Sequence, residues 1–175
     1  MKTWILLAWI ALAGFVPGRS AAGVHAPARQ VEKERILVVV NRSNPIDSLT
    51  IDQVRHLFLR RDLTWERPLS ERKQPLPEAK SDFDPREKVL PIELTRTLEH
   101  KAFLEHVLQK DENALERHWI KLEYQHAVMR PKRVGTPDRV IKYTASLKGC
   151  IGFVNAKDLD ARALEHVKVV FSFDV

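Results

Sequence analysis

Short apolar runs alternate with amphipathic helical patterns along most of this chain, and this order constrains its fold more than any other feature. Strand-like runs occupy residues 36–40, 89–94, 133–134, 150–154 and 167–173. The segments between several of them repeat apolar residues at helical spacing. Strands that alternate with helices predict an α/β fold, with a mixed or parallel sheet and helices on both of its faces.

The first and second runs carry the clearest strand signals. Ile36 to Val40 is a continuous apolar, β-branched run, a pattern typical of a strand covered on both faces, as in a parallel sheet. Val89 to Leu94 has the same character. Its Pro91 cannot donate a ladder hydrogen bond, so we expect it at the edge of the sheet or at the end of the strand.

Capping residues place the starts of three helices. Thr50 and Gln53 form a capping-box pattern before a predicted helix over 51–60. Asp111 precedes a predicted helix over about 112–124. Thr136 is followed by proline and an acid, which predicts a helix that begins there and ends at Gly149.

Residues 66–88 show no apolar period and contain four prolines among mixed charges. A connection of this length is usually a functional loop or a mobile insertion. We therefore predict a mobile surface loop, and a partner-binding loop is the alternative. Trp65, immediately before it, is expected to pack over the preceding helix; stacking on a ligand is the other interpretation.

The N-terminus has the pattern of a signal peptide. An apolar run from Trp4 to Val16 follows Lys2, is short for a bilayer span, and ends at Pro17. Small residues then suit cleavage after residue 22 or after residue 26; an uncleaved anchor is the alternative. Removal of residues 1–22 takes away Lys2 and Arg19 but no acid, which lowers the formal charge from +6 to +4.

The predicted organisation is therefore a signal peptide at 1–22, a flexible lead-in at 23–34 and a single domain over 35–175. About 150 residues are enough for one domain with a single core. Cleavage of the signal would leave no stable membrane span. We expect a periplasmic protein, in which the single Cys150 cannot form an internal disulfide and is buried.

Composition and spacing argue against several functional classes. Lysines and arginines are spread among acids without a basic stripe, so nucleic acid is not an expected partner. No serine lies in a G-x-S-x-G setting, and the histidine spacings do not place two ligands on adjacent helical turns. We expect no enzyme activity, no metal site and no cofactor, and histidines that are mostly exposed on helices.

A strand that enters a helix through Thr95, Arg96 and Thr97 has the pattern of an anion-binding corner. The first N–H groups of a helix have no internal partner, and an arginine can clamp an oxyanion. Two other segments, Asn41–Asn44 and Gly135–Thr136, are expected to end near this turn, because ligands bind at the carboxyl ends of strands. The simpler interpretation is that Thr97 and Thr136 are ordinary caps and Arg96 is a solvated surface residue.

The order of these motifs resembles the phosphate-binding periplasmic proteins of ABC transporters. The stretch ILVVVNRSNPIDSLTIDQVRHLFLRRDLTW is similar to the strand, "NP…L" turn, helix and tryptophan of their second lobe. LPIELTRTLEHKAFLEHVL resembles the segment "P-V-x-R…S-G-T…F…V-L", ALERHW the tryptophan-bearing helix, and RVGTPDRVIKYTASLKGCIGFVNA the closing segment. The resemblance covers about residues 36–156 and implies one lobe of a type II periplasmic binding protein.

The departures from that family concern the ligand site. The family closes its ligand between two lobes, whereas this chain resembles a short, single-lobe member. The Ser-Gly-Thr of the family falls near Thr97-Leu98-Glu99, which lacks the glycine and adds an acid that would repel phosphate. Cys150 replaces the usual alanine, and the 66–88 segment is longer than its counterpart.

We therefore expect an exported, non-catalytic protein that resembles solute-binding proteins and binds phosphate or another oxyanion weakly. The candidate ligand-binding residues are Ser43, Asn44, Thr95, Arg96, Thr97 and Thr136. An ABC transporter or another envelope protein is the expected protein partner. The alternative is a ligand-free interaction module of the bacterial envelope that reuses the binding-protein lobe.

Overall fold

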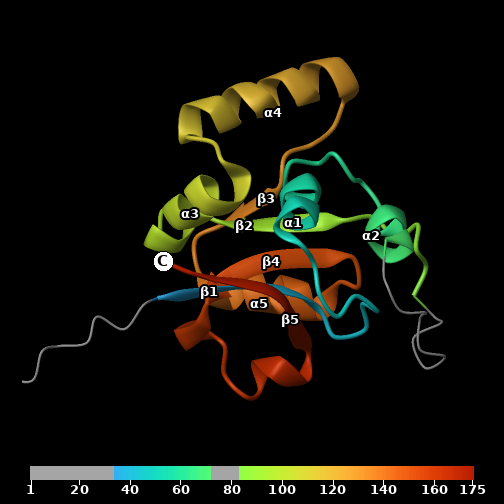
Figure 1. The fold of residues 1–175 in the computed structure, drawn as a ribbon, viewed down its shortest axis with the longest axis vertical. Coiled ribbons are helices and arrows are strands. Elements are labelled where there is room, and N and C mark those ends of the chain that lie inside the picture. Colours follow the sequence, from blue (N-terminus) through green and yellow to red (C-terminus); the bar gives the residue numbers. More distant parts are fainter. Residues whose placement is uncertain (1–33, 72–82) are drawn as a thin grey trace, which may run out of the picture. The chain divides into compact units, whose positions relative to one another are not determined.

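The computed structural model describes residues 34–71 and 83–175. These residues form a five-stranded mixed sheet in the order β3-β2-β4-β1-β5 (Figure 1). The strands are β1 (Arg35–Asn41), β2 (Leu90–Leu94), β3 (Lys132–Val134), β4 (Cys150–Asn155) and β5 (Val167–Asp174). The predicted α/β class with a mixed sheet is confirmed.

The direction of β1 differs from the sequence-based interpretation. β2 runs parallel to both β3 and β4, but β1 runs antiparallel to both β4 and β5. Val38, Val39 and Val40 are nevertheless fully buried. The continuous apolar run therefore reflects burial on both faces of the sheet and not parallel neighbours, which the periodicity alone could not distinguish.

The helices begin close to the predicted caps. They are α1 (Ile51–Phe58), α2 (Glu66–Ser70), α3 (Leu98–Phe103), α4 (Glu112–His126) and α5 (Pro137–Ser146). A π-helical segment (Leu104–Leu108) continues α3, and 3-10 turns span Ala156–Asp158 and Ala163–Glu165. The capping box at Thr50 and Gln53 is formed, with both reciprocal hydrogen bonds present.

The two faces of the sheet are covered by different helices, as expected. Helix α5 packs on one face, where Gly152 of β4 leaves room for Val140. The next residue of the strand, Phe153, points to the opposite face because side chains alternate along a strand. There its ring stacks on Phe103 of α3, with centroids 4.1 Å apart, and Phe103 meets Phe58 of α1 edge-on at 4.7 Å.

Pro91 is accommodated at the end of a strand, one of the two predicted positions. β2 is an inner strand, but its pairing with β3 starts only at Ile92. At Pro91 the strand pairs with Ile151 of β4 alone. The missing N–H of the proline therefore breaks no ladder hydrogen bond on the β3 side.

The segment predicted as a loop has structure where it is described. Helix α2 occupies its start, and Phe83, close to its end, is buried. Trp65 is fully buried, donates from Nε1 to the carbonyl of Gly149 at 3.3 Å and packs edge-on against Phe83. Trp65 is therefore a core residue, and its packing over the preceding helix stays a prediction. Residues 72–82 lie outside the described residues, so the mobility of the segment stays a prediction.

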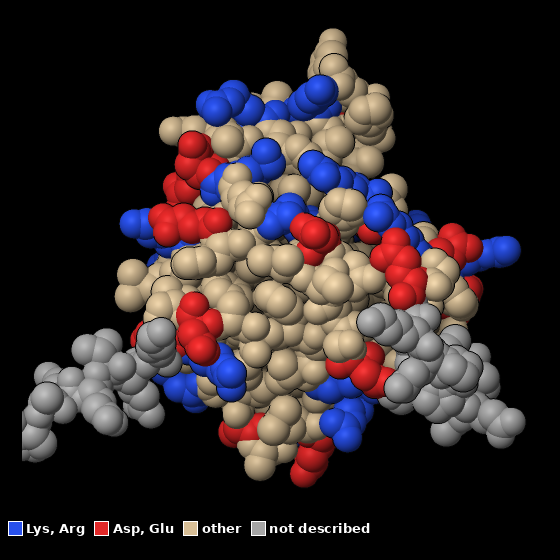
Figure 2. Space-filling view, in the orientation of Figure 1, with Lys and Arg blue, Asp and Glu red and all other residues tan. Residues whose placement is uncertain are grey.

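The predicted signal peptide (1–22) and nearly all of the predicted lead-in (23–34) also lie outside the described residues. The described residues belong to one compact unit. None of its helices is long and apolar enough to cross a membrane. On the face shown in Figure 2, Lys and Arg are interspersed with Asp and Glu.

Candidate functional site

The predicted corner between β2 and α3 is formed, and hydrogen bonds fix it to β3. The backbone N–H of Thr95 donates to the carbonyl of Val134 at 3.0 Å, and its hydroxyl reaches the same oxygen at 3.4 Å. Thr97 is the N-cap of α3, and its hydroxyl accepts from the N–H of His100 at 3.2 Å. Both hydroxyls therefore hold the turn, and Thr97 is the ordinary cap that the simpler interpretation expected.

Arg96 lies between them in an unusual conformation. Its φ angle is 63°, in the left-handed region that non-glycine residues rarely adopt. The side chain is exposed and forms no ion pair with the described residues. The turn thus presents a guanidinium to solvent at the carboxyl end of β2.

The end of β3 lies next to this turn, as predicted. Val134, which accepts the hydrogen bonds of Thr95, is followed by Gly135 and Thr136. Thr136 is the N-cap of α5 by position and Pro137 follows it, but the Thr136 hydroxyl makes no capping hydrogen bond. The predicted hydroxyl cap is therefore wrong in its contact, although the helix begins where expected.

Ser43 and Asn44 do not join this corner, which corrects the predicted grouping. Because β1 runs antiparallel to β4, its carboxyl end lies beside the amino ends of β4 and β2. Thr95 follows the opposite end of β2, roughly 16 Å away at about 3.3 Å for each of the strand's residues. The two side chains serve local turns: Ser43 Oγ donates to Asn41 Oδ1 at 2.7 Å, and Asn44 Oδ1 accepts from Ile46 at 2.9 Å.

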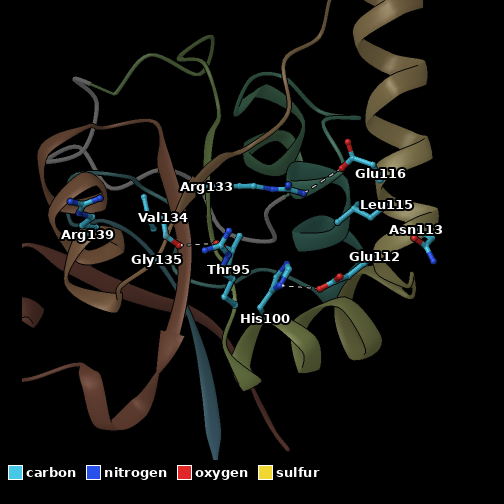
Figure 3. A pocket seen from close by; sticks show the side chains of 11 residues that line it. Thr95, His100, Glu112, Asn113, Leu115, Glu116, Arg133, Val134, Gly135 and Arg139 are labelled. Carbon is cyan, nitrogen blue, oxygen red and sulfur yellow. Dashed lines mark hydrogen bonds and ion pairs between the residues drawn. The ribbon is translucent and has the colours of Figure 1, made fainter.

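Two of the remaining candidates, Thr95 and Arg96, border a cavity of about 620 Å³, whereas Thr97 and Thr136 do not line it. Thr95 and Arg96 line it from the β2–α3 turn, Arg133 and Gly135 from the end of β3, and Arg139 from the first turn of α5. Helix α4 contributes its first turns, which Figure 3 shows facing Arg133 and His100. A volume of this size falls in the range of small-molecule pockets.

Glu93 and His100 form a buried pair, and His100 lines this cavity. Glu93 is 3% exposed on β2, and its Oε1 lies 3.0 Å from His100 Nε2. Its second oxygen accepts from Arg133 Nε at 3.1 Å. Burial raises the pKa of Glu93, but the hydrogen bonds and charges of His100 and Arg133 outweigh burial, so the pKa lies below its ordinary value.

The pair is extended by ion pairs to α4. Glu116 lies 3.7 Å from Arg133 and 2.9 Å from Arg130, and Glu112 lies 4.0 Å from His100 (Figure 3). These contacts hold α4 against the edge of the sheet. They also engage Arg133, which leaves Arg96 and Arg139 as the lining arginines without an ion pair to the described residues.

Glu99 should repel an anion in the cavity less than its position in the sequence indicates. Its Oε1 accepts from Asn155 Nδ2 at 3.2 Å and lies 3.9 Å from Lys157 Nζ. Burial raises the pKa of Glu99, but hydrogen bonds from its own backbone, Thr97 and Asn155, with the charge of Lys157, lower it overall. These groups therefore stabilise Glu99 as a carboxylate in the first turn of α3. Glu99 does not line the cavity.

Glu93, His100 and Arg139 were not predicted from the sequence. The expectation of mostly exposed histidines is wrong for His100, which is 7% exposed. One signal was available, since an acid in the apolar run VLPIEL must find a partner if it is buried.

Among the described residues, no group of three or more histidine, cysteine, aspartate or glutamate side chains could hold a metal ion.

Solved structures share the fold of this chain. An ABC-type phosphate transport receptor from Vibrio cholerae matches with a TM-score of 0.51 and 13% identity over 78% of this chain and 45% of its own. A putative phosphate ABC transporter substrate-binding protein from Clostridium perfringens, solved with bound phosphate, matches with a TM-score of 0.52 and 14% identity. The match covers 78% of this chain and 44% of that protein.

PstS from Borrelia burgdorferi matches with a TM-score of 0.52 and 10% identity, over 78% of this chain and 46% of its own. This chain therefore spans less than half the length of these proteins. Identities this low show similarity of fold alone. No family model matches the sequence, and no curated protein matches it.

Proposed function

We propose that this protein is an exported, non-catalytic solute-binding-like protein that holds a small oxyanion weakly beside the β2–α3 turn. One observation carries the proposal: Arg96 and Arg139 line the same cavity, and neither forms an ion pair with the described residues. Guanidinium groups bind phosphate and sulfate through paired N–H donors. The fold shared with phosphate receptors supports the same ligand class.

The binding is expected to be weak for two reasons. The hydroxyls of Thr95 and Thr97 already serve the turn, so they offer the ligand little. The cavity is also much larger than a phosphate ion, and the acids Glu112 and Glu116 line its α4 side. We therefore expect a millimolar affinity, and we include an ABC transporter or another envelope protein as the partner in this proposal.

Titration calorimetry of the full chain with phosphate and with sulfate at low ionic strength tests the proposal. Low salt is needed because exposed charges are screened within about 10 Å at 0.1 M salt. We expect saturable heat for both anions. Arg96→Ala and Arg139→Ala should each weaken binding about tenfold, since a hydrogen bond to a charged group contributes about 1.5 kcal/mol or more.

Arg162→Ala is the matched control, because Arg162 is exposed and does not line the cavity. Its affinity should equal that of the parent chain. Absence of heat at tens of millimolar anion, or equal affinity in Arg96→Ala, would contradict the oxyanion proposal. That result would favour the alternative interaction module, for which the exposed Ile120 and Tyr124 of α4 offer apolar surface.

A further inference from the structure

A second, smaller cavity lies beside the amino-terminal half of β2. It measures about 230 Å³ and opens where β3 has not yet begun, next to Leu90 and Pro91. Its walls are mainly apolar. Three of its lining residues, Leu90, Met129 and Leu147, are large hydrophobic side chains that are 37%, 74% and 41% exposed. We call this cavity the edge groove.

Two cations that line the edge groove have no carboxylate partner among the described residues. Arg60 donates from Nη1 to the carbonyl of Val89, but its buried Nε has no hydrogen-bond partner. Lys132 places Nζ 4.2 Å from the ring centroid of Tyr143. Neither forms an ion pair with any residue in the described ranges. The third cation, Arg130, is engaged by Glu116 and Glu123.

Arg60 occupies a position at which glycine would be the unstrained residue. It follows the end of α1 with a φ angle of 58°, in the left-handed region. Burial also lowers the pKa of Arg60. Arg60 is therefore a strained, partly buried arginine whose Nε donor has no acceptor among the described residues, and such positions often serve binding.

We propose that the edge groove binds a small apolar carboxylate. The carboxylate accepts hydrogen bonds from Arg60 and Lys132, and the apolar body lies against Leu90, Met129 and Leu147. The volume corresponds to roughly eight water-sized groups at about 30 Å³ each, which suits a carboxylate of medium chain length. This site is separate from the larger cavity beside the β2–α3 turn, since the two cavities share no lining residue.

Titration of the full chain with sodium octanoate, below its micellar range, tests the assignment. Octanoate should bind saturably. Acetate has the charge without the apolar body, and 1-octanol has the body without the charge, so each should bind about tenfold more weakly. Equal binding of 1-octanol and octanoate would overturn the carboxylate assignment, as would absence of octanoate binding.

The decisive variant is Arg60→Gly, because it removes the cation and also relieves the left-handed strain. It should fold with a Tm at or above that of the parent chain and bind octanoate about tenfold more weakly. Lys132→Gln should weaken binding in the same direction. Arg61→Ala removes a neighbouring cation outside the groove and should bind as the parent does.

Met129→Ser tests the apolar wall at a mostly exposed position, and it should weaken octanoate binding while the fold is kept. Parental affinity in folded Arg60→Gly and Lys132→Gln would overturn the proposal. Arg96→Ala should leave octanoate binding unchanged, so failure of the oxyanion proposal and failure of this one are distinguishable.

Discussion

At the scale of single residues, the most informative side chain is Glu93. It is a carboxylate inside an apolar strand, and it is stabilised there by His100 and Arg133. A buried charge is strongly unfavourable unless it is paired and hydrogen-bonded, so removal of one partner exposes the full desolvation penalty of the other. The pair therefore holds α3 to β2 and, through Arg133 and Glu116, α4 to β3.

Glu93→Gln should lower the free energy of unfolding by about 2–3 kcal/mol at neutral pH, measured by urea titration. The folded-state pKa of Glu93 lies below its ordinary value of 4.5. Its contribution is thus present above about pH 4.5 and is lost as the pH falls through the folded-state pKa. The difference in unfolding free energy between the parent chain and Glu93→Gln should become smaller in that acid range.

Glu116→Gln is the control for this prediction, because the Glu116 side chain is 45% exposed and its ion pairs are screened by solvent. Glu116→Gln should lower the free energy of unfolding by about 1 kcal/mol or less. A parent-to-variant difference for Glu93→Gln that stays constant from neutral to acid pH would contradict the role assigned to the carboxylate charge.

At the scale of elements, the packing of α5 on β4 positions the end of the helix that borders the cavity beside the β2–α3 turn. A Cβ added at Gly152 would lie 2.4 Å from Val140 Cγ1, closer than any packed pair of atoms allows. Val140 is fully buried and β-branched, so its rotamer cannot easily adjust. The absence of a side chain at Gly152 therefore sets how closely α5 approaches the sheet.

Gly152→Ala should destabilise the chain by about 1–3 kcal/mol, the usual cost of overpacking, in chemical denaturation. Val140→Ala in the same chain should relieve the clash. The loss of unfolding free energy in the double variant should then be smaller than the sum of the two single losses by about 1 kcal/mol or more. Gly135→Ala is the control, since nothing lies within 4 Å of its added Cβ and its φ is not positive. Strict additivity of the two changes would contradict direct contact.

At the scale of the whole molecule, the proposed location depends on residues 1–22. A chain that carries them should appear in the periplasmic fraction of a Gram-negative host, shortened by about 22 or 26 residues, as the small residues after Pro17 predict. A variant that begins at residue 23 should stay in the cytoplasmic fraction. Mass spectrometry of the purified protein gives the cleavage position, and a full-length mass in the periplasm would contradict cleavage.

Most of the elements could be predicted from the sequence for a local reason, although α2 lies in a segment predicted as a loop. Helices and strands follow from periods of apolar residues and from caps, such as Thr50 with Gln53, that act over a few residues. The corner at Thr95–Thr97 was predicted to lie near Gly135–Thr136 because ligands bind at the carboxyl ends of strands. The structure places them together because β2 and β3 are parallel neighbours and Thr95 donates to Val134. Cys150 is buried as expected, and burial raises the pKa of its thiol to about 12.

Only the tertiary structure decided which segments meet. The periodicity of Ile36–Val40 carries no information on direction, and its antiparallel pairing moves Ser43 and Asn44 to the far end of the sheet. The partners of Glu93, and the exposed cations Arg96 and Arg139 on one cavity, likewise result from long-range packing. The sequence by itself determined the elements and the fold class, whereas strand direction and side-chain convergence depend on pairings between residues distant in the chain.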